Sequence, residues 1–193
     1  MSGRLGDACW RFGLVGMIKK MRHITLITTG GTIEKTYDEF SGTLLNRGSV
    51  VRKMLRRLRL QSTVINVIEV LSKDSLHMTD DDRRVIAEAV HTCGGSQSLP
   101  TNAEGIVVLH GTDTLTVTGE QLRARFTAPR VPIVLTGAMR PYEMIRSDAL
   151  QNLTEAIFAA GVLSPGVYCV AHGRALAFPG VRKDREVGTF VRA

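Results

Sequence analysis

Two segments place reactive side chains directly after apolar runs. Residues 24–33 read Ile-Thr-Leu-Ile-Thr-Thr-Gly-Gly-Thr-Ile, so a buried strand is expected to run into two glycines and then the hydroxyl of Thr32. Residues 105–109 form a second short apolar run, which opens into Thr112 and the carboxylate of Asp113. Ligands of open α/β sheets bind at the carboxyl ends of the strands. The spacing therefore places both groups where a substrate would bind.

The chemistry that suits these groups is acyl transfer. Such a reaction needs a nucleophile, a base that removes its proton and donors for an oxyanion. Thr32 has the hydroxyl, and the backbone N–H groups around Gly30, Gly31 and Thr32 are candidate oxyanion donors. The chain has no Gly-x-Ser-x-Gly elbow, no Gly-x-Gly-x-x-Gly after a strand and no phosphate-binding P-loop motif.

The elements that must position these groups alternate between strands and helices. This alternation predicts an α/β fold with a doubly wound, largely parallel sheet and helices on both faces. Residues 34–47 are polar and predict a loop or small hairpin over the site, and the tail from 172 to 193 is expected to be polar with two short apolar patches. The expected strands are 24–30, 64–71, 105–109, 131–135 and 166–171. The first expected helix begins at 49 and has its apolar face at 51–58, and the other expected helices are 79–90, 114–126 and 147–161.

Length and composition fit one domain. The 193 residues are 44% hydrophobic, which allows a full core for residues 23–193 behind a basic, poorly structured leader, residues 1–22. The three cysteines are widely spaced, which favours a reducing cytoplasm over a disulfide framework. The net charge of +7 is concentrated in the leader, so it is a weak indication of nucleic-acid binding.

Three motifs together resemble one known family. Thr-Gly-Gly-Thr-Ile (29–33), His-Gly-Thr-Asp-Thr (110–114) and Gly-Ala-Met-Arg-Pro (137–141) are similar to signatures of the bacterial-type L-asparaginase/glutaminase family. The resemblance covers roughly residues 23–190 and is to the N-terminal domain only. It implies hydrolysis of the side-chain amide of L-asparagine, or of a related amide, through a threonine acyl-enzyme. It also implies a homodimer or higher homo-oligomer, with no cofactor, metal, nucleic acid or membrane.

The resemblance assigns roles to the catalytic residues. Thr32 matches the nucleophile, and Tyr37 matches the residue that assists removal of its proton. Thr112, Asp113 and Lys183 match a Thr–Lys–Asp relay, in which Lys183 is placed by Val-Arg-Lys-Asp after the last expected strand.

The resemblance also implies a set of substrate contacts. Gly31 belongs to this set, and Ser72 matches a contact to the substrate carboxylate. Asp113 would bind the α-amino group, and Ala138 would bind the side-chain amide through its backbone.

Two departures from the family pattern leave alternatives open. Full-length relatives carry a C-terminal domain that completes a neighbouring site, and this chain is expected to lack its counterpart. Lys73 stands where relatives often have glutamine, and its charge is expected to attract a carboxylate and repel an ammonium group. The alternatives are a non-catalytic protein that binds an amino acid or a partner, and nucleic-acid binding through the leader and the basic face of residues 52–59. His110, beside a glycine, is expected to be structural.

Overall fold

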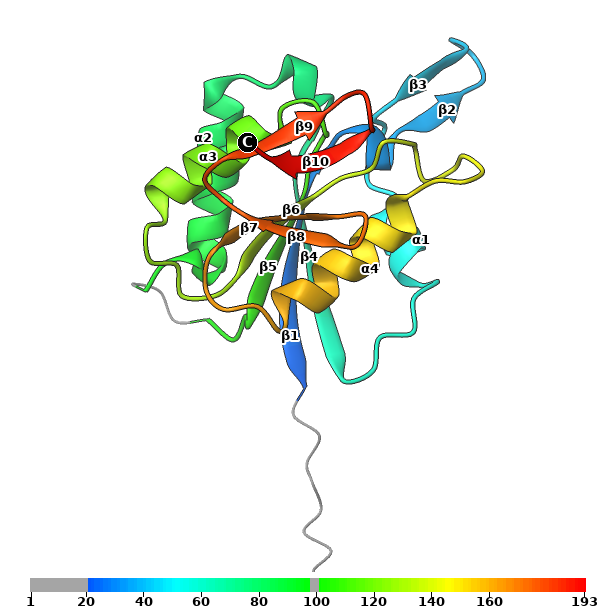
Figure 1. The fold of residues 1–193 in the computed structure, drawn as a ribbon. Coiled ribbons are helices and arrows are strands. Elements are labelled where there is room, and N and C mark those ends of the chain that lie inside the picture. Colours follow the sequence, from blue (N-terminus) through cyan, green and yellow to red (C-terminus); the bar gives the residue numbers. More distant parts are fainter. Residues whose placement is uncertain (1–20, 98–100) are drawn as a thin grey trace, which may run out of the picture.

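The protein is built around a six-stranded sheet in the order β4-β1-β5-β6-β7-β8 (Figure 1). The computed structural model describes residues 21–97 and 101–193, so most of the expected leader lies outside the described residues. The first five strands in this order are parallel, and the last is antiparallel to its neighbour. The strands are β1 (Arg22–Gly30), β4 (Thr63–Lys73), β5 (Gly105–Leu109), β6 (Ile133–Thr136), β7 (Val167–Ala171) and β8 (Arg174–Ala177).

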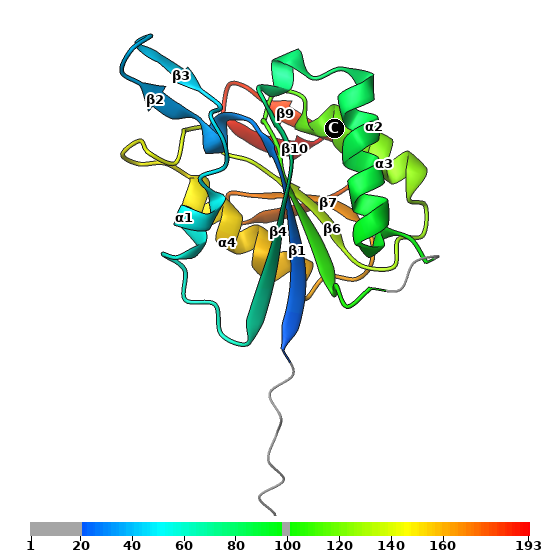
Figure 2. The same ribbon diagram turned by 180° about the vertical axis from the view of Figure 1, so that it is seen from behind.

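Helices cover both faces of this sheet. One face carries α2 (Asp80–Val90) and α3 (Leu115–Arg125), and the other carries α1 (Val51–Leu55) and α4 (Ala149–Ala160) (Figures 1 and 2). Successive strand residues point to opposite faces, so a strand covered on both sides must be apolar throughout. Ile106 and Val108 accordingly pack into the core under α2 and α3, whereas Val107 and Leu109 pack under α4. The prediction of a doubly wound α/β fold is confirmed.

The ends of two helices follow from local hydrogen bonds. Thr79 caps α2 in a capping box with Asp82, as the threonine before the aspartate run predicted. Helix α1 ends earlier than the expected apolar face at 51–58, because the N–H groups of Arg57 and Leu58 bond to carbonyl groups three residues back rather than four. These bonds tighten the last turn and end the helix. Leu58 still packs against the core from this turn.

The tail from residue 172 is more regular than the sequence indicated. Instead of a polar tail it forms β8 and then an antiparallel hairpin of β9 (Val181–Asp184) and β10 (Thr189–Arg192). Phe178, Val181 and Phe190 are buried and anchor this segment on the core. Each strand has only four residues, so the alternation of apolar and polar residues was too short to be recognised.

Short elements surround the carboxyl ends of the strands. A hairpin of β2 (Thr36–Asp38) and β3 (Thr43–Leu45) projects from the sheet, which confirms the hairpin expected in 34–47 (Figure 1). Single turns of helix follow the strands at η1 (Thr32–Glu34) and η2 (Ser75–His77), and η3 (His91–Gly95) extends α2. Across the described residues, no helix is both long enough and apolar enough to cross a membrane.

Candidate active site

The turns after three neighbouring strands touch one another at the carboxyl edge of the sheet. Gly30 and Gly31 have φ angles of +94° and +82°, which L-residues with side chains rarely adopt. A Cβ on Gly31 would lie 2.4 Å from Cα of Gly111, and one on Gly30 would lie 2.5 Å from the backbone nitrogen of Lys73. Glycine is therefore required for β1 to end between β4 and β5. Thr32 is the next residue, and it begins the short helix η1 directly after this contact.

Lys183 joins the groups that follow β5. Its Nζ donates to Oγ1 of Thr112 at 2.8 Å and to Oδ1 of Asp113 at 3.0 Å. Thr112 is buried, and the side chains of Asp113 and Lys183 are 22% and 15% exposed. The guanidinium of Arg185, largely exposed, lies 3.2 Å from the same Asp113 oxygen. The structure thus brings together the three side chains that the family resemblance groups as a relay, with the lysine supplied by β9.

Thr32 and Tyr37 are the other two expected catalytic residues, and they lie in different surroundings. Thr32 is half-buried at the Gly31–Gly111 contact, beside the start of the Thr112 segment. Tyr37 lies on the projecting hairpin with 60% of its surface exposed, and its backbone N–H donates to Glu143 at 3.2 Å. Within the described part of the chain, its hydroxyl makes no hydrogen bond to Thr32.

Two of the three backbone N–H groups that were expected to stabilise an oxyanion already donate hydrogen bonds within the protein. The Gly30 N–H donates to Oε2 of Glu34 at 3.0 Å, and the Gly31 N–H donates to the carbonyl of Lys73 at 2.8 Å. The prediction for these two N–H groups is wrong, because the turn uses them to close on itself and on β4. The Thr32 N–H is the donor that stays a candidate.

Glu34 is a functional candidate that the sequence reading missed. Its side chain is buried beneath the glycine turn, where it accepts hydrogen bonds from the Gly30 N–H and the Ser49 hydroxyl. Burial raises its pKa to about 7, and the two hydrogen bonds only partly oppose this effect. An acidic residue two places after Gly-Gly-Thr was visible, but no local pattern distinguishes a buried carboxylate from an exposed one.

A cavity of about 520 Å³ lies between the end of β4 and the segment that carries the hairpin. Ser72, exposed at the end of β4, lines it together with Lys35 and Asn46. Asn46 Nδ2 donates to the carbonyl of Gly31 at 2.9 Å, which ties the cavity wall to the glycine turn. The volume lies within the range of small-molecule sites.

Lys73 also lines this cavity but is paired with another element. Its Nζ lies 2.7 and 2.9 Å from the two carboxylate oxygens of Asp82 at the start of α2. Lys73 is the main cause that holds the pKa of Asp82 at about 2. Asp82 therefore offsets the charge of Lys73, and the expected attraction of Lys73 for a substrate carboxylate stays a prediction.

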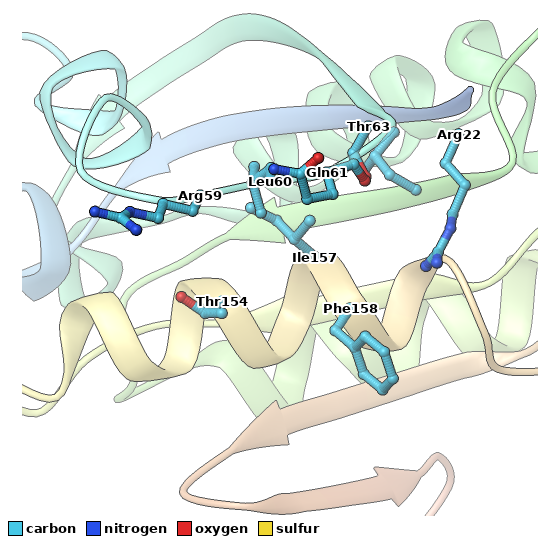
Figure 3. Close-up of a pocket in the computed structure, with 9 residues that line it drawn as sticks. Arg22, Arg59, Leu60, Gln61, Thr63, Thr154, Ile157 and Phe158 are labelled. Atoms are coloured by element: carbon cyan, nitrogen blue, oxygen red, sulfur yellow. The ribbon is translucent and has the colours of Figure 1, made fainter. Parts of the chain in front are cut away.

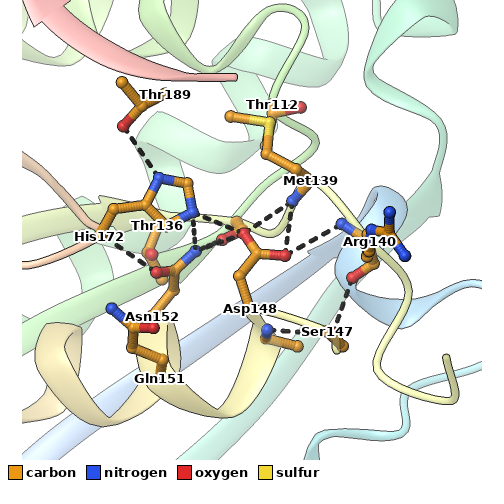
Figure 4. A network of polar contacts seen from close by, with 12 residues as sticks. Thr112, Thr136, Met139, Arg140, Ser147, Asp148, Gln151, Asn152, His172 and Thr189 are labelled. Carbon is orange, nitrogen blue, oxygen red and sulfur yellow. Dashed lines mark hydrogen bonds and ion pairs between the residues drawn. The ribbon is translucent and has the colours of Figure 1, made fainter. Parts of the chain in front are cut away.

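Ala138 lies in the turn that follows β6 and is buried. Asp148 holds this turn from the start of α4: its carboxylate accepts the backbone N–H groups of Met139 and Arg140 at 2.9 to 3.1 Å (Figure 4). His172 approaches the same carboxylate from the end of β7. The sequence reading did not identify Asp148 or His172, and the only signal was an aspartate directly before a helix.

His110 is held as a structural group, in line with the expectation. Both ring nitrogens are engaged, Nδ1 with the carbonyl of Gly111 and Nε2 with the hydroxyl of Thr118, each at 2.9 Å. Complete burial lowers its pKa to about 4, so the ring is neutral near pH 7.

Two further observations concern other kinds of site. Among residues 21–97 and 101–193, no group of three or more His, Cys, Asp or Glu side chains is arranged to hold a metal ion. A second hollow of about 190 Å³ lies at the opposite, amino end of β1 and β4, where Arg22, Arg59 and Phe158 line it (Figure 3). This hollow is separate from the groups described above.

Comparisons with known proteins place the chain in one family. Residues 23–188 match the family model described as "Asparaginase, N-terminal". A glutamyl-tRNA(Gln) amidotransferase subunit from Methanococcus maripaludis is 31% identical over 159 residues, which cover 80% of this chain and 36% of that protein. The L-asparaginase of Thermococcus kodakarensis is 28% identical over 165 residues, which cover 86% of this chain and 48% of that protein.

Solved structures are similar as well. The thermostable L-asparaginase from Thermococcus kodakarensis matches with a TM-score of 0.75 and 28% identity, over 88% of this chain and 51% of that one. L-asparaginase I from Vibrio cholerae matches with a TM-score of 0.77 and 25% identity, over 89% and 51%. The chain therefore spans between about a third and a half of the length of these relatives.

Proposed function

The chain belongs to the asparaginase family, and from this premise we propose that it is an asparaginase-type amidohydrolase. It would hydrolyse the side-chain amide of L-asparagine, or of a related amide, to the acid and ammonia. The observation that carries this proposal is the contact of Lys183 with both Thr112 and Asp113, beside the glycine turn that presents Thr32. A buried hydroxyl and a carboxylate that share one lysine are suited to proton transfer next to a nucleophile.

The reaction would proceed in two steps. In the first, Oγ1 of Thr32 attacks the amide carbon with the help of the Tyr37 hydroxyl, the C–N bond breaks, and the nitrogen leaves as ammonia after gaining a proton. The Thr32 N–H is the proposed donor to the oxyanion. In the second, water attacks the resulting ester and releases the acid and the free Thr32 hydroxyl. Since Tyr37 is mostly exposed here, the hairpin would have to bring it closer to Thr32 when substrate binds.

Lys183 would control protons on Thr112. Its ammonium group donates to the Thr112 oxygen, so the hydroxyl hydrogen of Thr112 is free to be donated toward the substrate. Asp113 keeps Lys183 in place and would also bind the α-amino group of the substrate. Arg185, on the outer side of Asp113, offsets part of its charge.

The remaining contacts would come from the neighbouring strand ends. Ser72 in the cavity wall would bind the substrate carboxylate, and the backbone at Ala138 would contact the side-chain amide. Gly31 would contact the substrate by packing alone, because its N–H and carbonyl already bond to Lys73 and Asn46. We further propose that the protein is cytoplasmic and forms a homodimer or higher homo-oligomer with no cofactor. Light scattering of the purified protein tests the oligomer.

The direct test is ammonia release from L-asparagine, L-glutamine and other amides. Thr32→Ala is expected to abolish turnover, because it removes the hydroxyl that would form the ester. Thr154→Ala is the matched control, since Thr154 is exposed on α4 and its hydroxyl donates to the Leu150 carbonyl of the same helix. Turnover that survives Thr32→Ala in folded protein would refute the proposal. Thermal stabilisation by an amino acid without turnover would favour the non-catalytic alternative.

The similarity to an amidotransferase subunit favours a second candidate function. In this case the same hydrolysis would supply ammonia for the formation of another amide, on a glutamyl-tRNA. Stimulation of ammonia release by such a tRNA, together with a preference for one amide donor, would support this role. Rates that are the same with and without the tRNA would support a free-standing amidohydrolase.

A further inference from the structure

The turn that carries Ala138 is fixed by one carboxylate. Both oxygens of Asp148 lie within hydrogen-bond distance of the Met139 N–H, at 3.1 and 2.9 Å, and Oδ1 also accepts the Arg140 N–H at 3.0 Å. Asn152 donates from Nδ2 to Oδ2 of Asp148 and to the Gly137 carbonyl, at 2.9 Å each. The direction of the peptide groups after Ala138 therefore depends on Asp148.

His172 connects this carboxylate to the hairpin of Lys183 (Figure 4). Its Nε2 lies 2.8 Å from Oδ2 of Asp148, and its Nδ1 lies 2.9 Å from the hydroxyl of Thr189. Thr189 begins β10, which pairs with the strand that contains Lys183. The imidazole thus spans the gap between the turn after β6 and the β9–β10 hairpin.

The backbone of His172 adopts a positive φ, which is uncommon for residues other than glycine. His172 and Gly173 form the two-residue connection between β7 and β8, with φ angles of +52° and +75°. Such connections require positive φ at both positions, and Asn, Asp or Gly usually occupy them. A histidine here accepts an unfavourable backbone conformation, and its side chain makes the two contacts described above.

The ionised state of Asp148 is maintained against burial. Burial of the carboxyl favours the neutral form, but the hydrogen bonds from the Met139 N–H, His172 and the Arg140 N–H outweigh it and hold the pKa of Asp148 below its usual value. A neutral carboxyl could not accept all of these bonds. The charge on Asp148 is thus part of how the turn is held.

We propose that Asp148 and His172 are a pair of positioning residues that hold the Ala138 turn in register with Lys183. This inference rests on the proposed function, in which the Ala138 backbone contacts the amide that is cleaved. Neither residue needs to touch the substrate. Their effect would be on the geometry of the leaving group, where a misplacement of about 1 Å can cost on the order of 100-fold in rate.

The test compares Asp148→Asn with Glu155→Gln. Glu155 is also on α4 and its carboxylate accepts a backbone N–H, that of Gly173 at 2.8 Å, but it does not contact the Ala138 turn. Each variant is assayed with L-asparagine and with L-aspartic acid β-hydroxamate, which has a better leaving group. If a variant sample contains less correctly folded protein, the apparent kcat falls by the same factor for both substrates. The ratio of the two kcat values therefore reports positioning alone.

Asp148→Asn is expected to lower kcat for the amide on the order of 10-fold more than kcat for the hydroxamate, with little change in KM. His172→Gln is expected to change the ratio in the same direction by less, and Glu155→Gln is expected to leave it unchanged. Equal losses on both substrates in Asp148→Asn would overturn the proposal.

Amide hydrogen exchange provides an arm that is independent of activity. The N–H groups of Met139 and Arg140 are expected to lose protection in Asp148→Asn, while the protection of the sheet strands is retained. His172→Gln is expected to increase exchange in β10. If the wild-type protein cleaves neither substrate, the proposed function fails and the exchange pattern alone decides whether the pair holds the turn. Unchanged protection at Met139 and Arg140 would overturn the positioning role.

Discussion

Replacement of Lys183 by methionine tests the central contact of the candidate site. Methionine keeps most of the length and the apolar stem of lysine but has no ammonium group. Thr112 and Asp113 would both lose their hydrogen bond from Nζ, at 2.8 and 3.0 Å. Asp113 would keep its contact with Arg185, so the carboxylate would not be left without a counter-charge.

The Lys183→Met replacement is expected to change stability and activity by different amounts. Charged hydrogen bonds at sites this poorly exposed contribute about 1.5 to 3 kcal/mol, and the remaining Arg185 contact reduces the expected loss of stability to about 1 to 2 kcal/mol. Loss of a group that controls a proton costs about 100-fold to 10,000-fold in rate, which is about 3 to 5 kcal/mol of transition-state free energy. Activity should therefore fall much more than stability.

The assay is ammonia release by Lys183→Met, with urea unfolding of the same samples. Arg125→Met is the control, because it also removes a cation from an ion pair, at 2.6 Å from Glu88. Arg125 is the last residue of α3, whose 11 residues place it about 16 Å from the end that follows Asp113. A Lys183→Met protein that is folded and within about threefold of wild-type kcat/KM would refute the reasoning.

Two further predictions concern the glycine turn. The pKa of Glu34 is raised to about 7 in the folded state, so the unfolded chain releases this proton first as pH rises from about 4.5 and stability falls up to pH 7. Glu34→Gln removes this dependence of stability on pH. The free energy of unfolding of the variant relative to wild type, measured with urea, should therefore rise by about 3 kcal/mol between pH 4 and pH 8. A difference in unfolding free energy that stays constant over this range would contradict the raised pKa of Glu34. Gly31→Ala should cost more than about 3 kcal/mol, because its Cβ would meet the Gly111 backbone. Gly48→Ala has a similar φ of +94° and open space, and it should cost only about 1 to 2 kcal/mol in the same measurement; equal losses would show that the close approach at Gly31 is not what matters.

The sheet and the glycine turn could be predicted because their signals are local. Ile24, Leu26 and Ile27 predict a strand that is buried on both faces, as 24–30 is, and the glycines mark where the strand ends. The contact between Gly31 and Gly111 then follows, since parallel strands deliver their ends to one edge. The sequence could not indicate which backbone N–H groups of this turn already donate hydrogen bonds within the protein. The Gly31 N–H, for example, bonds to a residue 42 positions away.

Lys183 could be located only through the family resemblance. It lies 71 residues after Thr112, and no periodicity or composition links the two positions. The hairpin that contains Lys183 has the sequence pattern of a polar tail, because its strands are only four residues long. Asp148 and His172 are separated by 24 residues, and no local pattern links these two positions either. Contacts between side chains on different short elements depend on tertiary geometry that local patterns do not contain.

The antiparallel turn after β7 has a consequence for synthesis of the protein. Up to Ala171 the chain has made all five parallel strands of the sheet, and Thr32, Thr112 and Asp113 are already present. Domains fold as units while the chain emerges amino end first. A nascent chain at this stage has the scaffold but not Lys183, which is fixed only when β9 pairs with β10. In the proposed mechanism, the group of Thr112, Asp113 and Lys183 is therefore complete only after the segment that forms the β9–β10 hairpin has been synthesised.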